Sequence, residues 1–287
     1  MYKIKDQNSK FKIVELPQSG NGFLLRFAAC TLIFAFLFAG CEQQHEKEEP
    51  VPALAPDAEA VSVSTDYAAR AIEATGGLDA WVRTKEVRLD CVVTLYQPDG
   101  SHYLTEQRFA VYPWLNSIRI SAAEPQGTLV WQLSNGQFQV LQGSGRIAEL
   151  PKAASGKCFA EAVLNITTAP ARFLDDSAQF AKQNTAVKIQ GQWYHPIERQ
   201  PRPGAASAGR LTPAAFYQDR DNSLIDMLQF ACTDTGKSLI VRGYDYDRIE
   251  KAGPLLPARI EIFGTDARGS LQERLVKIDC HQWSSAK

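Results

Sequence analysis

Apolar and polar residues alternate with a period of two over residues 87–95. The apolar side chains of this stretch share one face, while Glu86, Arg88, Asp90 and Thr94 share the other. Successive side chains of a strand point to opposite faces, so this pattern predicts a half-buried strand. Pro98-Asp99-Gly100-Ser101 has the composition of a turn, and residues 102–112 then predict a second strand. The two segments together predict a long hairpin.

The alternation continues through three further short segments. They contain Ile118 and Ile120, then Leu129, Trp131 and Leu133, and then residues 137–142. Asn135-Gly136 separates the last two segments and is a strong signal for a tight hairpin. The first half of the folded region is therefore predicted to be an antiparallel meander.

Two segments have a helical period instead. Asp66 follows Ser64 and Thr65, which are good N-cap residues, and Gly76-Gly77 supplies a C-cap, so we expect a helix from Asp66 to Thr75. Leu78 and Trp81 are predicted to pack this helix onto the following strand. The second helix is predicted between residues 157 and 176 from the spacing of Phe159, Ala162, Val163 and Ile166, and Pro170 interrupts it.

Six more strands are predicted in the second half. They cover residues 186–190, 214–219, 224–232, 238–247, 258–263 and 273–282, and residues 200–212, rich in Pro, Gly and Ala, predict a long loop. The total is about ten or eleven antiparallel strands with two helical pieces. An amphipathic sheet of this size must cover its apolar face, so we predict an α+β fold in which a strongly curved sheet is covered by helices.

The N-terminal region has the pattern of an export signal. A basic leader precedes residues 27–40, which carry no charge. About 20 apolar residues are needed to span a bilayer, so this run favours a signal peptide over residues 1–40, with a transmembrane anchor as the alternative. Leu37-Phe38-Ala39-Gly40-Cys41 resembles the bacterial lipobox, although Phe38 stands where Leu is usual. The resemblance implies that Cys41 is lipidated and becomes the mature N-terminus.

Composition and charge exclude several classes of protein. The whole chain has a net charge of −1, with 45% hydrophobic and 22% charged residues, which is ordinary for a globular protein. Removal of the leader takes five basic and two acidic residues and leaves 26 basic and 30 acidic residues, a net charge of −4. Nucleic-acid binding through bulk charge is therefore not expected. Residues 41–65 are rich in Glu, Pro and Ala and predict a flexible linker before a domain of residues 66–287.

The chain offers no motif that assigns catalysis, a metal or a cofactor. His102, His195 and His281 are the imidazoles of the predicted domain, and none lies in a G-x-S-x-G or H-E-x-x-H motif. We therefore predict no catalytic residue, no metal and no cofactor. A hydrolase whose site is assembled only in three dimensions stays open as a third alternative.

Four cysteines follow Cys41. Cys91, Cys158, Cys232 and Cys280 allow three complete pairings, and none stands in a C-x-x-C motif. In an exported protein these residues could form one or two disulfides, or they could be small buried apolar side chains. The sequence leaves both readings open.

The order of the elements resembles the periplasmic lipoprotein-carrier superfamily. The shared features are a short helix ending at Gly76-Gly77, Trp81, a hairpin containing residues 96–100, a mid-chain helix, and late strands near residues 241–246 and 256–260. This resemblance implies an incomplete β-barrel whose concave apolar face receives acyl chains. No single binding residue of the family is matched, and we select as the candidate ligand-binding wall the apolar residues Val87, Leu89, Val93, Leu95, Phe109, Val111, Ile120, Leu129 and Trp131, with a filled core as the alternative.

We therefore favour a non-enzymatic lipoprotein of the bacterial envelope that faces the periplasm. It would be anchored through acyl chains on Cys41, with a lipid or acyl ligand, and its place would be in lipoprotein or lipid trafficking. The alternative is a structural lipoprotein with a filled core that binds an envelope protein. Glu42 follows Cys41 in place of the Asp that retains some lipoproteins at the inner membrane, so the outer membrane is preferred.

Overall fold

The computed structural model describes residues 65–124, 127–143, 155–174, 178–202, 214–232, 234–249, 253–266 and 269–286. All of them belong to one compact unit, Lys47–Lys287. The predicted signal peptide, Cys41, the linker up to residue 64 and most of the predicted loop over residues 200–212 lie outside the described residues. Among the described residues, no helix is both long and apolar enough to span a membrane.

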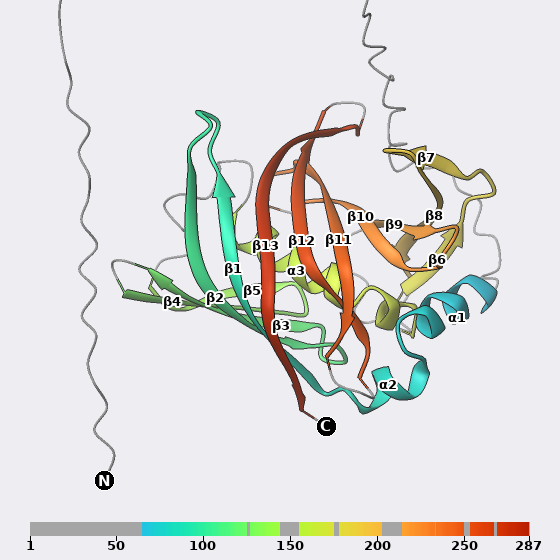
Figure 1. Cartoon of the computed structure of the whole chain (residues 1–287), viewed down its shortest axis with the longest axis horizontal. Coiled ribbons are helices and arrows are strands. Elements are labelled where there is room, and N and C mark those ends of the chain that lie inside the picture. Colours follow the sequence, from blue (N-terminus) through green and yellow to red (C-terminus); the bar gives the residue numbers. More distant parts are fainter. Residues whose placement is uncertain are drawn as a thin grey trace, which may run out of the picture. The chain divides into compact units, whose positions relative to one another are not determined.

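One antiparallel sheet of 13 strands forms the body of the fold. Its order is β5-β4-β3-β2-β1-β13-β12-β11-β10-β9-β8-β6, with β7 paired to β8. The strands are β1 (Glu86–Tyr96), β2 (His102–Tyr112), β3 (Ser117–Glu124), β4 (Gly127–Ser134), β5 (Gln137–Gln142), β6 (Ala178–Lys182), β7 (Val187–Ile189), β8 (Gln192–Pro201), β9 (Ala214–Asp219), β10 (Ile225–Ala231), β11 (Ser238–Arg248), β12 (Leu255–Thr265) and β13 (Leu271–Ala286). Figure 1 shows this sheet curving strongly without closing. The predicted curved antiparallel sheet and its N-terminal meander are confirmed.

The predicted number of strands was too low, because β6 and β8 were not recognised. Pro196 lies in the middle of β8, and a proline inside a segment disfavours the prediction of a strand there. Glu198 and Arg199 are charged, although both are buried in β8. Their charges remove the apolar pattern from which a buried strand would be predicted. The predicted loop over residues 200–212 also began too early, since β8 continues to Pro201.

Two short helices precede the sheet. Helix α1 (Thr65–Ala74) ends where Gly76 and Gly77 adopt positive φ angles of 114° and 87°, as expected for a glycine C-cap. Helix α2 (Leu78–Arg83) then buries Trp81 completely. The expectation for Leu78 was wrong, because its side chain is 48% exposed. Ala80 and Trp81 form the buried side of α2, and at 100° per residue Leu78 and Val82 fall on the other side.

Helix α3 (Gly156–Thr167) occupies the concave side of the sheet, and the 3-10 helix η1 (Pro170–Leu174) follows it. Figure 1 shows the strands curving around α3, which contacts β3, β4, β10, β11 and β12. Ser155 caps the helix by accepting a hydrogen bond from the backbone N–H of Cys158 at 3.1 Å. The inner faces of both halves of the sheet and the buried side chains of α3 form one continuous apolar core.

Candidate functional site

The predicted ligand-binding wall forms a continuous surface on the inner face of β1 to β4. Its first row crosses four strands, since Leu89 pairs with Phe109, Phe109 with Ile120, and Ile120 with Trp131. A second row is made by Val87 and Val111, which the sequence predicted, together with Ile118 and Leu133, which it did not. All nine predicted wall residues are buried, and Leu129 is the most exposed of them at 9%.

A third row differs in chemistry because it contains an amide. Cys91 pairs with Gln107, Gln107 with Ala122, and Ala122 with Leu129. Gln107 is only 3% exposed, and neither Oε1 nor Nε2 has a hydrogen-bond partner among the described residues. Buried polar atoms are usually paired, so this amide is the unusual group of the wall. Its place between Thr105 and Phe109 in the period-two pattern was the signal that could have identified it.

Helix α3 covers this wall. The ring of Phe159 packs edge-on against that of Phe109, with 6.0 Å between the ring centroids. Cys158, in the first turn of α3, forms a disulfide with Cys232, which directly follows β10. The disulfide therefore fixes the N-terminal end of the covering helix to the other half of the sheet.

The structure resolves one of the cysteine pairings left open by the sequence. Cys158 and Cys232 are bonded, whereas Cys91 and Cys280 are buried free thiols that face each other across β1 and β13, with 2.7 Å between their Sγ atoms. Burial raises the pKa of the Cys91 thiol far above its usual value. The Asp234 carboxylate lies 3.1 Å from the sulfur atoms of Cys158 and Cys232, a set of atoms that could hold a metal only if the disulfide were reduced.

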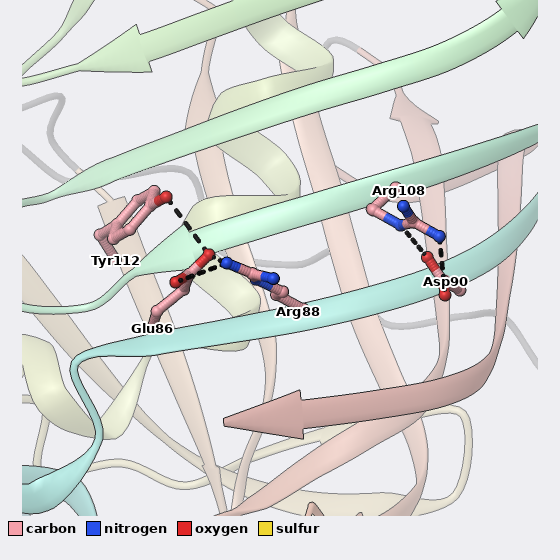
Figure 2. Close-up of polar contacts among 5 residues, drawn as sticks. All are labelled: Glu86, Arg88, Asp90, Arg108 and Tyr112. Atoms are coloured by element: carbon pink, nitrogen blue, oxygen red, sulfur yellow. Dashed lines mark hydrogen bonds and ion pairs between the residues drawn. The ribbon is translucent and has the colours of Figure 1, made fainter. Parts of the chain in front are cut away.

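The outer face of the same strands is polar (Figure 2). Arg88 Nε donates to Glu86 Oε1 at 2.8 Å, and Arg108 Nε donates to Asp90 Oδ1 at 2.5 Å. The hydroxyl of Tyr112 also donates to Glu86 Oε1 at 3.3 Å. These hydrogen bonds from the arginines lower the pKa of Glu86 and of Asp90. Arg88 and Arg108 are thus each matched by a neighbouring carboxylate.

Two grooves adjoin this outer face. One has a volume of about 660 Å³ and is lined by Arg88, Asp90, Arg108, Asp247, Ile249, His281, Gln282, Trp283 and Ser284. The other has a volume of about 370 Å³ and is lined by Asp90, Cys91, Glu106, Gln107, Arg108, Ser121, Ala122, Ala123, Thr128 and His281. Cys91, Gln107 and Ala122 belong to the third row. The smaller groove therefore lies over the strands that carry the third row, on the outer side of the sheet.

The three histidines lie on different strands. His102 is on β2, His195 on β8 and His281 on β13. Burial lowers the pKa of His195, whose Nδ1 has no hydrogen-bond partner in the described part of the chain. Within those residues, none of the three imidazoles is hydrogen-bonded to a serine or a carboxylate. The described geometry thus assembles no Ser–His–Asp arrangement around them.

No family model matches the chain, and no curated protein matches it in sequence. Its fold is similar to that of solved structures. One is a LolA superfamily protein from Nitrosomonas europaea, with 12% identity over 79% of this chain and 95% of that chain, and a TM-score of 0.49. Another is a DUF1329 family protein from Desulfovibrio piger, with 11% identity over 79% of this chain and 94% of that chain, and a TM-score of 0.44.

Proposed function

We propose that this chain is a non-enzymatic lipoprotein of the bacterial envelope, anchored through Cys41, that binds an acyl chain or another apolar ligand between the wall and α3. The observation that supports this proposal most strongly is the set of cross-strand rows on the inner face of β1 to β4. These rows form one apolar surface, and α3 covers it. Concave apolar surfaces with few polar groups are typical of small-molecule sites. Lipoprotein or lipid trafficking is the role that fits such a ligand.

Gln107 supplies the polar group that such a site needs to orient its ligand. A buried amide without partners costs about 1–3 kcal/mol, which a ligand could recover by hydrogen bonding to it. The ester or amide of an acylated molecule has a carbonyl oxygen that accepts from Nε2, while its hydrocarbon chain would lie along the apolar rows.

The packing of α3 favours a second candidate, a structural lipoprotein that binds an envelope protein. Phe159 and Phe109 are in edge-on contact, and the wall residues are at most 9% exposed, as in an ordinary filled core. On our first proposal, α3 has to shift so that the acyl chain can enter. The disulfide at Cys158 limits that shift at one end of the helix, so movement would be largest toward Thr167.

Mass spectrometry of organic extracts tests the proposal directly. Noncovalent lipid should be recovered from the purified protein, and added fatty acid should raise its melting temperature by mass action. Ala122→Leu adds volume to the third row, and we expect it to reduce the recovered lipid severalfold. Ala110→Leu makes the same change between Arg88 and Arg119 on the outer face and serves as the matched control.

Circular dichroism and thermal melting of both variants separate loss of the site from loss of the fold. An extract without lipid, together with a melting temperature that fatty acid does not change, would contradict ligand binding. The same result accompanied by recovery of one dominant protein crosslinked in cells would support the structural candidate.

A further inference from the structure

Four large apolar side chains lie exposed at one end of the domain. Leu78 and Val82 of α2 are 48% and 58% exposed, and Trp114 and Leu115 of the turn between β2 and β3 are 42% and 64% exposed. We call these four residues the α2 patch. Apolar side chains exposed singly are common on soluble proteins, but a cluster of this kind marks an interaction surface.

A hydrogen bond joins the two parts of the α2 patch. The indole Nε1 of Trp114 donates to the backbone carbonyl of Trp81 at 3.2 Å, which places the turn against α2 beside Val82. Leu78 and Val82 are four residues apart on α2 and therefore lie on the same side of that helix. The hydrogen bond therefore brings the turn and α2 together, and the patch is built from both elements.

The turn that carries Trp114 and Leu115 is held in place from both sides. Pro113 is buried before it, and Asn116 ends it with a positive φ angle of 46°. The backbone N–H of Asn135, in the turn between β4 and β5, donates to the carbonyl of Asn116 at 3.1 Å. Leu115 is therefore exposed on a turn whose backbone is held by neighbouring parts of the domain.

We propose that the α2 patch docks on the surface of a lipid bilayer. Because the indole N–H of Trp114 is already bonded within the domain, the ring can enter the interface without leaving a polar group unpaired. Tryptophan and leucine are the side chains typical of such interfacial contacts. Lys85 is exposed beside the patch, as is Arg83, which donates to Asp79 Oδ2 at 3.2 Å in a solvent-exposed ion pair, and both cations suit the phosphate groups of lipids.

The position of the patch in the chain favours a membrane as the occupant. The segment that precedes the described residues ends directly before Thr65, the first residue of α1, and α2 follows α1 after a turn at Gly76-Gly77. An anchor at Cys41, which rests on the proposed function, would hold the α2 patch within the reach of a linker of residues 42–64. Tethering raises the local lipid concentration, so even a weak docking contact would be populated.

Quenching of tryptophan fluorescence by brominated lipid tests this proposal on the membrane-bound full-length protein. The protein is reconstituted in vesicles of phosphatidylethanolamine and phosphatidylglycerol, with or without brominated acyl chains. The chain contains five tryptophans, of which Trp81 and Trp131 are fully buried. We expect quenching that Trp114→Phe abolishes. Trp193→Phe, at a tryptophan that is 44% exposed on β8, should leave it unchanged.

A second pair of variants reports on the patch without touching a tryptophan. Leu78→Ser combined with Val82→Ser should reduce the quenching of Trp114 at least threefold. Leu104→Ser is the matched control, because Leu104 is 54% exposed on β2 and precedes the patch turn, which begins at Pro113, by nine residues. Absence of quenching in the membrane-bound wild-type protein would overturn the proposal, and so would crosslinks through the α2 patch to a second copy of the chain.

The proposed function and the docking of the α2 patch can each be contradicted without the other. If Cys41 carries no lipid, Cys41→Ser leaves the amount of membrane-bound protein unchanged, a result that concerns only the anchor. If the interior binds no ligand, lipid extraction fails while Trp114 is still quenched. If the α2 patch does not dock, Trp114 is not quenched although the protein is bound to vesicles.

Discussion

The outer faces of the two halves of the sheet differ in how far their side chains are buried. In β1 and β2 the outer face is exposed and carries ion pairs such as Arg108 with Asp90. In the C-terminal half the outer face is apolar and buried around β9 and β10, and all six residues of β9 are buried. A second apolar cluster lies there, made by Ile189, Tyr194, Ala215, Tyr217, Met227, Ile240 and Leu271, with Val187 and Phe263 against it.

Polar groups are also buried within this second cluster. Arg242 is 8% exposed and donates from Nη2 to the hydroxyl of Tyr194 at 3.1 Å, and Tyr194 donates to Asp226 Oδ2 at 3.3 Å. Burial raises the pKa of Asp226 to about 7. The N-terminal half is therefore a one-sided sheet, buried mainly on its inner face, while the C-terminal half is two-sided around β9 and β10, where both faces are buried.

The disulfide between Cys158 and Cys232 joins the covering helix α3 to the C-terminal half of the sheet, and its loss should have the largest effect. It closes a loop of 74 residues, so Cys158→Ser combined with Cys232→Ser should lower the free energy of unfolding by about 4 kcal/mol. Urea unfolding measures this value, and reduction of the wild-type protein should reproduce it. An unchanged unfolding midpoint after reduction would show that α3 is held by packing alone.

The next largest effect on stability is expected from shortening a side chain on the outer face, and this effect should differ between the two halves. Met227 is fully buried on the outer side of β10, so Met227→Ala should cost about 2–5 kcal/mol of stability. Val92→Ala on the outer side of β1, where the side chain is only half-buried, should cost less than about 1 kcal/mol. Chemical denaturation of both variants makes the comparison, and equal losses would remove the distinction between the halves.

Asp226 predicts a pH dependence that originates in the two-sided half. Its pKa is raised from 3.8 to about 7 in the folded state, so between about pH 4 and pH 7 the folded protein retains a proton that the unfolded chain has lost. The contribution of this group to stability therefore falls as pH rises through that window. Asp226→Asn should remove the decline, measured as the free energy of unfolding at pH 5 and pH 8.

The groups that face Asp226 act in both directions on its pKa. Arg242 lowers it and Asp219 raises it, while burial is the largest effect. Identical pH profiles for the wild-type protein and Asp226→Asn would show that Asp226 is ionised throughout this range.

The exposed ion pairs of the one-sided half should have the smallest effect. Arg108 is on the solvent side of β2, and water and salt screen its attraction to Asp90. Arg108→Gln should leave the melting temperature unchanged but raise the pKa of Asp90, because the hydrogen bond that lowers it is lost. Nuclear magnetic resonance titration of the Asp90 carboxyl checks the shift, and a large drop in melting temperature would contradict the weak coupling.

The difference between the halves also explains which elements could be predicted from the sequence. Alternation identified β1 and β2 because one face of each strand meets solvent. The nine predicted wall residues are all buried on the inner face. β8 lacks this signal, since its charged Glu198 and Arg199 are buried and Pro196 interrupts it. Gln107 and the bond between Cys158 and Cys232 depend on contacts between distant segments, which spacing alone does not specify.

Photocrosslinking with a fatty acid that carries a diazirine on its chain tests the ligand site most directly. After irradiation, proteolysis and mass spectrometry identify the modified peptides. The proposed function predicts adducts on the inner residues of β1 to β4 and on α3, with loss of these adducts in Ala122→Leu and their retention in Ala110→Leu. Adducts confined to the outer surface, or an Ala122→Leu variant labelled like the wild-type protein, would contradict a ligand site beneath α3.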